Sequence, residues 1–356
     1  MKLLVITQKV DKNDSNLGFF HAWLEKIAQR VDYLYVICLE KGEYSLPENV
    51  TVLSLGKEEN RSRLKYLWRF YFYIFKYEKE YDGVLVHMNP EYIVLGGWLW
   101  RLWQKKVLLW YTHKSVDLKL KIAEKLVTKI FTASKESFRL KSNKVEIVGH
   151  GINVAEFWSS TSSGRAYYDQ NLVLKLITVG RIAPAKDLET IIKAVVYLIE
   201  KKSGLSVSLD IIGEAILPQD IVYQENLKNK YAQFSQTIKF LGKRNHQEMP
   251  KEYQSHQLFV HSSKTGSVDK VVLEALASGC PVVTSGEAYA DAVQQGVVFV
   301  FPIGDYKKLA EAIEKTQSSG ILNSDKLPNV SAIEYVRKNH NLDLLINRIQ
   351  GYFSQK

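Results

Sequence analysis

The sequence predicts an α/β protein of two doubly wound domains, each built on a mostly parallel sheet. Three observations support this. The 356 residues suffice for two ordinary cores, strand-like and helix-like patterns alternate, and most apolar runs lack polar alternation. Strands covered by helices on both faces show such continuous apolar runs. Two similar units imply a cleft between them, and open α/β sheets bind ligands beyond the carboxyl ends of their strands.

The first domain is expected over residues 1–157. Its strands are predicted at 2–10, 34–39, 51–55, 83–87, 106–112, 129–133 and 145–148. Its helices are predicted at 18–30, 61–80, 90–104 and 116–127. A polar, Ser-rich stretch at 158–171 predicts a linker.

The second domain is expected over residues 172–335. Its strands are predicted at 173–179, 206–212, 237–241, 257–261, 281–284 and 297–300, and its helices at 187–201, 220–235, 247–253, 268–278 and 306–316. The last segment, 336–356, contains an amphipathic helix at 341–353, which is expected to return to the first domain.

Composition and motifs exclude several classes of protein. The two cysteines, Cys38 and Cys280, lie far apart, which argues against a disulfide framework or a zinc site and favours a reducing, cytoplasmic setting. The first apolar run is short and is followed by a polar one, which predicts a strand rather than a signal peptide. The glycine-rich fingerprint of NAD and FAD enzymes and the P-loop signature are both absent from the sequence.

Two segments of the second domain predict an anion site. In the first, 176–198, Gly180 permits a tight turn after a strand, and Arg181 and Lys186 bring two positive charges to the strand's carboxyl end. The alternative is an ordinary surface loop with basic residues. In the second, 256–285, a polar loop leads into a helix with Ser267 as its natural N-cap, and the first N–H groups of a helix bind anions.

Together these segments resemble the donor domain of glycosyltransferase family 4, which comprises retaining enzymes of the GT-B fold. The resemblance covers most of 172–316. It rests on Gly180, Arg181 and Lys186, and on IIGEA at 211–215, FLGKR at 240–244, VLEALASGCPVV at 272–283 and GDYKKLAEAI at 304–313. It implies two Rossmann-like domains and a nucleotide-sugar donor of the UDP or GDP type.

The resemblance also implies roles for individual residues. The donor diphosphate is expected at Arg181, Lys186, Gly18, Gly180, Gly266 and Ser267; the ribose and base at Glu274, Gly242 and Lys243; and the donor sugar at Thr265 and Lys270. His113 and Asp269 are the candidate catalytic residues. For His113 the alternative is a structural hydrogen bond, and for Glu274 it is a solvated helix surface.

The chain departs from the family pattern at one position. The family usually has a second Glu eight residues before the ribose-binding one, and here that position is Gly266. This puts in doubt which group contacts the donor sugar; Asp269, Thr265 and the backbone at Gly266 and Ser267 are candidates. In the first domain, VGHGINVAEF at 148–157 resembles the family's closing segment, but the usual double glycine near Gly18 is missing.

The family transfers sugars with retention and without a bound metal, and the D-x-D metal signature is absent from this sequence. No cofactor or metal is therefore expected. Charge on the leaving diphosphate would be stabilised by Arg181, Lys186 and the helix N-terminus near Ser267.

The acceptor side is less clear. Residues 1–150 hold 25 Lys and Arg against 17 Asp and Glu, so most of the net charge of +10 lies there. The segment 61–81 predicts a helix with a basic stripe flanked by aromatics, and 96–106 repeats the pattern. This suits an anionic membrane surface at the inner face of the membrane and a carbohydrate or lipid-linked acceptor, such as a polysaccharide precursor. The alternative is a helix packed by its aromatic faces with its charges merely solvated.

Two other functions stay open. One is a basic membrane- or polyanion-binding protein of the same fold without catalysis, for which the missing acidic residue at Gly266 is the best support. The other is a nucleotide-sugar epimerase, which lacks an evident pair of catalytic carboxylates. Nucleic acid is not an expected partner.

Overall fold

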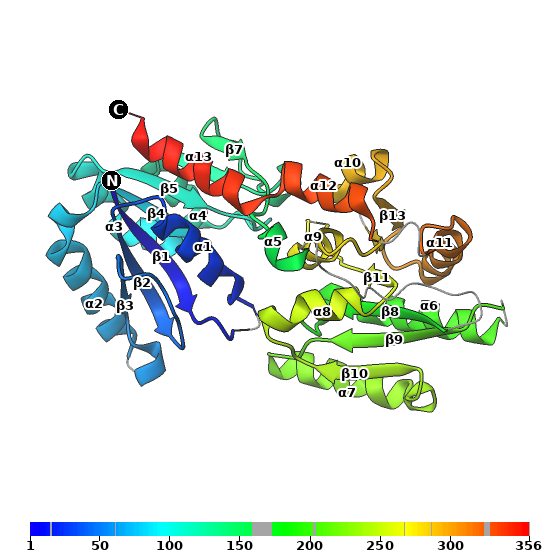
Figure 1. The fold of residues 1–356 in the computed structure, drawn as a ribbon. Coiled ribbons are helices and arrows are strands. Elements are labelled where there is room, and N and C mark those ends of the chain that lie inside the picture. Colours follow the sequence, from blue (N-terminus) through cyan, green and yellow to red (C-terminus); the bar gives the residue numbers. More distant parts are fainter. Residues whose placement is uncertain are drawn as a thin grey trace. The chain divides into compact units, whose positions relative to one another are not determined.

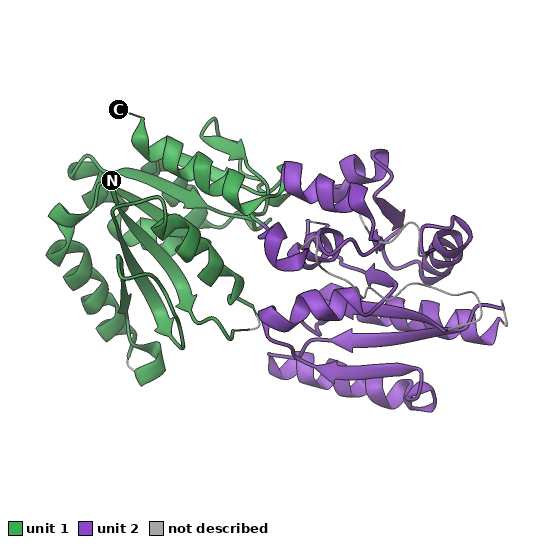
Figure 2. Cartoon of the chain, viewed as in Figure 1, with its two compact units in different colours: residues 1–151, 340–356 green, residues 152–339 purple. Residues whose placement is uncertain are grey.

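The computed structural model describes residues 1–14, 16–60, 62–158, 173–201, 204–266, 268–285, 287–323 and 328–355. The chain divides into two compact units. Unit 1 comprises residues 1–151 and 340–356, and unit 2 comprises residues 152–339 (Figure 2).

In the described part of unit 1, seven strands form one parallel sheet in the order β3-β2-β1-β4-β5-β6-β7 (Figure 1). The strands are β1 (Lys2–Val10), β2 (Tyr33–Lys41), β3 (Val50–Ser54), β4 (Gly83–His87), β5 (Lys106–Trp110), β6 (Lys129–Thr132) and β7 (Val145–Ile147). The central strands are buried on both faces, which explains their continuous apolar sequences.

Helices cover both faces of this sheet. They are α1 (Phe19–Ala28), α2 (Arg63–Lys76), α3 (Pro90–Leu102), α4 (Leu118–Leu126) and α13 (Leu342–Ser354). One core cluster joins α2, α3 and α4 to the sheet, and another joins α1 and α13 to it. The C-terminal helix α13 thus returns to the first unit, as predicted. Asp343 on α13 pairs with Lys26 and Arg30 of the α1 region.

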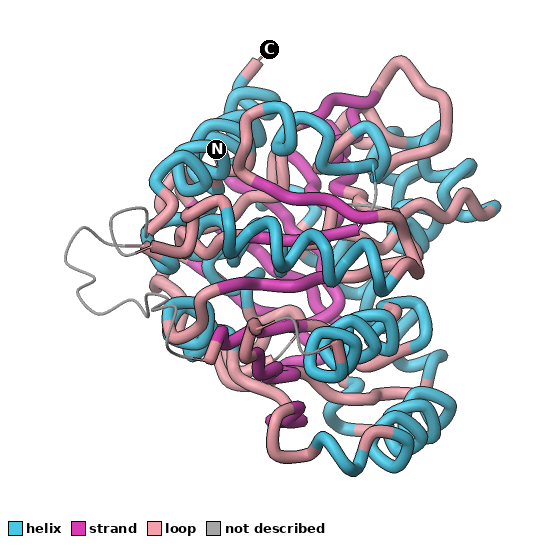
Figure 3. The backbone as a smooth tube through the Cα atoms, turned by 90° about the vertical axis from the view of Figure 1, so that its right-hand side faces the viewer, coloured by secondary structure: helices cyan, strands magenta, loops and turns pink. Residues whose placement is uncertain are grey.

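In the described part of unit 2, six strands form a second parallel sheet in the order β10-β9-β8-β11-β12-β13. They are β8 (Leu174–Val179), β9 (Val207–Ile212), β10 (Ile238–Gly242), β11 (Leu258–His261), β12 (Val282–Ser285) and β13 (Val298–Phe301). The helices, which flank the strands in Figure 3, are α5 (Val154–Phe157), α6 (Leu188–Glu200), α7 (Pro218–Lys230), α8 (Met249–Gln254), α9 (Lys270–Ala277), α10 (Ala290–Gln294), α11 (Tyr306–Ser318) and α12 (Val330–Asn339).

The predicted α/β class and all thirteen predicted strands are confirmed, with ends that differ by at most a few residues. The expected end of the first domain at 157 falls inside unit 2, because Val154 and Phe157 of α5 enter that unit's core. The expected end of the second domain at 335 falls inside α12, which packs on α9 through Ala332, Ile333 and Val336. The expected linker, apart from Trp158, lies outside the described residues.

Among the described residues, no helix is both long and apolar enough to cross a membrane.

Candidate functional site

The candidate site lies in unit 2, at the carboxyl ends of neighbouring strands of the sheet. Gly180 directly follows β8 with a φ of 151°, and Gly213 follows β9 with a φ of 145°. The N–H of Gly180 donates to the carbonyl of Ile212, so the two turns run backbone against backbone. A Cβ added at Gly213 would lie 1.9 Å from the carbonyl oxygen of Gly180. The turn therefore needs glycine at 213 for space as well as for conformation.

Hydrogen bonds join the two loops that the sequence predicted to share an anion. The N–H of Lys264, after β11, donates 2.9 Å to the carbonyl of Ala185, after β8. The Ser262 hydroxyl donates to Asp187 Oδ2 at 3.0 Å, and Lys264 Nζ lies 3.4 Å from Asp187 Oδ1. Asp187 is 5% exposed, so its carboxylate acts as a buried anchor between the loops. Because β8 and β11 are neighbouring parallel strands, residues about 80 apart in sequence lie in one site.

The predicted phosphate-binding Lys186 and the candidate catalytic Asp269 form an ion pair. Lys186 Nζ lies 2.8 Å from Asp269 Oδ2, and His261 Nε2 lies 2.8 Å from the same oxygen. The Asp269 N–H donates to the Tyr289 hydroxyl at 2.8 Å, which fixes the start of α9. Burial alone would raise the pKa of Asp269, but His261 and Lys186 hold it well below its usual range. Asp269 is therefore an ionised carboxylate that already neutralises one cation.

Arg181 is the more exposed of the two predicted phosphate ligands. Its side chain is 43% exposed, and its Nε lies 3.9 Å from Oδ2 of the buried Asp220, beyond hydrogen-bond distance. Asp220 Oδ2 has no hydrogen-bond partner among the described residues. A hollow of about 20 Å³, lined in part by Gly180, Arg181, Lys186 and Ser262, lies beside them and has room for one water-sized group.

Glu274 of α9 lies in a second buried cluster. Its Oε1 is 3.1 Å from Lys270 Nζ and 3.2 Å from His246 Nε2, and its Oε2 accepts the Tyr253 hydroxyl at 3.2 Å. The side chain is 5% exposed, so it is not the solvated surface residue of the alternative interpretation. Burial would raise the pKa of Glu274, but Lys270 and His246 lower it to about 2. Three donors occupy three of about four lone-pair positions, which leaves one at Oε2 for a further hydroxyl.

His246 is a site residue that the sequence analysis missed. Its Nδ1 lies 3.1 Å from Glu156 Oε1 while its Nε2 contacts Glu274. Burial lowers the pKa of His246, yet the two carboxylates raise it above its ordinary value. An imidazole between two carboxylates donates from both nitrogens, which favours the protonated ring. Its only sequence signal was its position a few residues after the FLGKR motif.

The other predicted residues of unit 2 lie around these two clusters. Gly242 ends β10 with a φ of 73° and open space at its Cβ position, and Lys243 Nζ lies 3.7 Å from Glu214 Oε1. The Thr265 hydroxyl lies 2.8 Å from the Ser263 hydroxyl, in the loop before α9. Gly266, in the same loop, has a φ of 61°. Lys270, predicted at the donor sugar, contacts Glu274. Ser267 lies outside the described residues.

Two predicted residues lie in unit 1. Gly18 precedes α1, and a Cβ there would lie 2.5 Å from the Asp14 carbonyl oxygen. His113 follows β5, and its Nδ1 accepts the N–H of Ser115 at 3.1 Å. A local hydrogen bond of this kind agrees with the alternative interpretation of His113 as a structural residue. The roles of both residues stay predictions.

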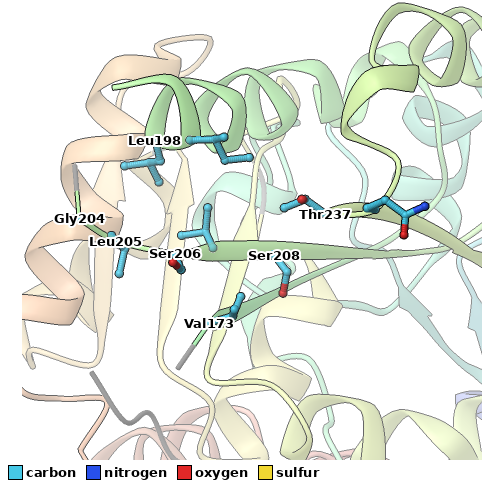
Figure 4. Close-up of a pocket in the computed structure, with 10 residues that line it drawn as sticks. Val173, Leu198, Gly204, Leu205, Ser206, Ser208 and Thr237 are labelled. Atoms are coloured by element: carbon cyan, nitrogen blue, oxygen red, sulfur yellow. The ribbon is translucent and has the colours of Figure 1, made fainter. Parts of the chain in front are cut away.

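A larger hollow of about 600 Å³ lies at the other end of the unit 2 strands, where β8, β9 and β10 begin (Figure 4). Val173, Gly204, Ser206 and Thr237 are among its lining residues, and no predicted site residue lines it.

Comparisons with known proteins concern mainly unit 2 and the fold. A family model of the glycosyl transferases group 1 matches residues 174–318, the stretch that contains both clusters apart from Glu156. Residues 174–318 are therefore similar to a glycosyltransferase group 1 domain, and the chain has the two parallel-sheet Rossmann-like domains of the GT-B fold.

The chain is similar to an uncharacterized glycosyltransferase of Methanocaldococcus jannaschii, at 29% identity over 160 residues. The match covers 42% of this chain and 38% of that protein's length. Among solved structures, Anabaena HepE in complex with UDP and glucose matches with a TM-score of 0.74 and 18% identity over 100% of both chains. Sucrose-phosphate synthase from Thermosynechococcus elongatus matches with a TM-score of 0.73 and 16% identity, over 99% of this chain and 98% of that one. At these identities the structural matches show the fold alone.

Proposed function

We propose that this chain is a glycosyltransferase that moves a sugar from a nucleotide-diphosphate sugar to an acceptor hydroxyl, with retention and without a metal. The observation that supports it most is the hydrogen-bonded loop pair after β8 and β11, which gathers Arg181, Lys186 and the start of α9 at one edge of the sheet. A guanidinium, an ammonium and a helix N-terminus together suit a diphosphate leaving group.

We expect the two clusters to bind different parts of the donor. Arg181 and Lys186 would bind the diphosphate, while the remaining lone pair of Glu274 would accept a ribose hydroxyl. Gly242 and Lys243, at the end of β10, would lie near the base. UDP is the first nucleotide to test, because HepE was solved with UDP and with UDP-glucose. For the acceptor we propose a carbohydrate or a lipid-linked precursor held at a membrane surface.

The test is calorimetric titration of the full chain with UDP, GDP and ADP, without added metal. We expect one nucleotide to bind, and we expect Arg181→Ala to weaken it ~10- to 100-fold, as loss of a charged hydrogen bond does. Arg337→Ala is the matched control, because Arg337 is an exposed arginine of the same unit that pairs with Glu334 on α12. The Arg337→Ala variant should bind the nucleotide with the same affinity as the unaltered protein.

Two results would refute the proposal: no binding of any nucleotide at millimolar concentration, or equal losses in the Arg181 and Arg337 variants. Transfer of labelled sugar from the bound donor then separates a transferase from a protein that only binds.

A further inference from the structure

Unit 1 presents an exposed apolar surface on α2 and α3, which we call the α2–α3 surface. It comprises Leu64 (79% exposed), Trp68 (66%), Phe72 (45%) and Phe75 (56%) on α2, with Trp98 (54%) and Leu102 (70%) on α3. Scattered exposed apolar residues are ordinary, but six large ones on two adjoining helices form a patch that marks an interaction site.

The helix α2 has two different apolar faces. Phe70 and Ile74 are buried against the sheet, with Tyr66, Tyr73 and Tyr77 packed around them. Leu64, Trp68, Phe72 and Phe75 lie on the opposite arc, at the i, i+4, i+8 and i+11 spacing of one helical face. The inner face accounts for the fold, so the outer aromatics are not needed to attach α2 to its own unit.

Contacts between the two helices make the surface continuous. The Tyr71 hydroxyl donates to the carbonyl of Leu95 on α3 at 3.1 Å, and the rings of Phe75 and Trp103 meet edge to face at 5.4 Å. Trp68 and Phe72 stack with 5.3 Å between ring centroids and 10° between planes. Figure 1 shows α2 and α3 on the same side of the unit 1 sheet.

The charges on α2 itself have one sign. The 14 residues of α2 contain no Asp or Glu, while Lys65 and Lys76 are exposed beside the apolar arc, as is Arg101 on α3. Acidic residues flank the helix at Glu59, Glu78 and Glu80, and α3 carries Glu91 in its first turn. Glu59 is paired with Arg69 and Glu80 with Lys2. Lys76 Nζ lies 5.7 Å from the Phe72 ring centroid, which keeps a cation over the aromatic face.

We infer that the α2–α3 surface docks this protein on a membrane that contains anionic lipid. In a dimer formed through this surface, the basic residues of one copy would face those of the other, and like charges repel each other. An anionic bilayer surface matches both properties, since tryptophan and phenylalanine insert at the headgroup level while Lys and Arg meet the phosphates. Such docking would hold the acceptor-side unit at a lipid surface, independently of donor binding in unit 2.

The test is flotation of the full chain with vesicles of phosphatidylcholine alone and of phosphatidylcholine with 30% phosphatidylglycerol, at about 0.1 M salt. We expect binding to the anionic vesicles only. Trp68→Ser with Phe72→Ser should abolish it, and Lys65→Glu with Lys76→Glu should weaken it at least ~25-fold, since each basic residue near such a surface contributes about fivefold.

The controls are Val222→Ser, on an exposed residue of α7 in unit 2, and the pair Lys251→Glu and Lys338→Glu, which makes the same charge change elsewhere. They should bind vesicles as the unaltered protein does. Nucleotide titration of each variant shows that unit 2 is intact and keeps this test separate from that of the donor site.

Three results would overturn the inference. The first is no flotation with anionic vesicles. The second is equal binding by the surface variants and the controls. The third is sedimentation showing a dimer in the absence of lipid that Trp68→Ser with Phe72→Ser dissociates, because a second copy would then occupy the surface.

Discussion

The buried carboxylate of Glu274 gives the sharpest prediction about unit 2. Its pKa lies at about 2 in the folded protein instead of 4.5, because Lys270 and His246 outweigh the effect of burial. One pKa unit is worth about 1.4 kcal/mol, so the charge of Glu274 stabilises the fold by about 3 kcal/mol at neutral pH. The side chain is 5% exposed, so solvent screening reduces this free energy only slightly. Glu274→Gln should lower the free energy of unfolding by that amount.

The pH dependence has a defined sign. A carboxylate with a lowered folded pKa stabilises the protein above the unfolded pKa, and this contribution is lost as pH falls from about 4.5 to about 2. About 2 kcal/mol of it is gone at pH 3, so the difference between the unaltered protein and Glu274→Gln should shrink to about 1 kcal/mol there. Urea denaturation at pH 7 and pH 3 measures both values.

Two further variants control this measurement. Glu334→Gln removes one partner of an exposed ion pair on α12 and should cost less than about 0.5 kcal/mol at either pH. Lys270→Met in the Glu274→Gln background should recover part of the loss, since burial lowers the pKa of Lys270 and leaves an ammonium that needs its carboxylate. A loss below 1 kcal/mol at pH 7, or one that does not change with pH, would refute the reasoning.

Three other predictions use the same denaturation and titration assays. Gly213→Ala should cost at least about 3 kcal/mol, because its Cβ would meet a backbone oxygen at 1.9 Å, whereas Gly242→Ala, with open space and a φ of 73°, should cost about 1 kcal/mol. Burial lowers the pKa of His340 to about 3, so about 2 kcal/mol of stability should be lost between pH 6.5 and pH 5, and His340→Asn should remove that slope. Asp269→Asn should tighten nucleotide binding severalfold by removing the carboxylate that neutralises Lys186; unchanged affinity would show that Lys186 does not contact the diphosphate.

The strands were predictable because a buried parallel sheet leaves long apolar runs in the sequence. The short helices α5 and α10 were missed because one or two turns show no reliable periodicity, and α12 because only Ala332, Ile333 and Val336 of its ten residues are buried. The wheel pattern of 61–81 offered two interpretations, and the structure shows that α2 packs by one aromatic face while exposing another.

The proximity of the loops after β8 and β11 could be predicted from the sequence, but the partners of their side chains could not. The turn after a strand with Arg181 and Lys186 left two interpretations open, an anion site and an ordinary basic surface loop. The contact of His246 with Glu274 joins a loop after β10 to the middle of α9, and only the fold brings them together. The same holds for Asp269, whose bonds to Lys186 and His261 depend on the order of β8 and β11 in the sheet.

Two cations of the site, Lys186 and Lys270, are already paired with carboxylates, and this determines which residue an anion meets first. Lys186 lies 2.8 Å from Asp269, and Lys270 lies 3.1 Å from Glu274, so a diphosphate must compete with a carboxylate for either ammonium. The side chain of Arg181 is 43% exposed and its Nε lies 3.9 Å from Asp220 Oδ2, so Arg181 loses a weaker ion pair when it binds a phosphate. Arg181→Ala should therefore cost more nucleotide affinity than Lys186→Ala when both are titrated under the same conditions. The reverse order would mean that donor binding breaks the Lys186–Asp269 pair and that the released ammonium supplies most of the affinity.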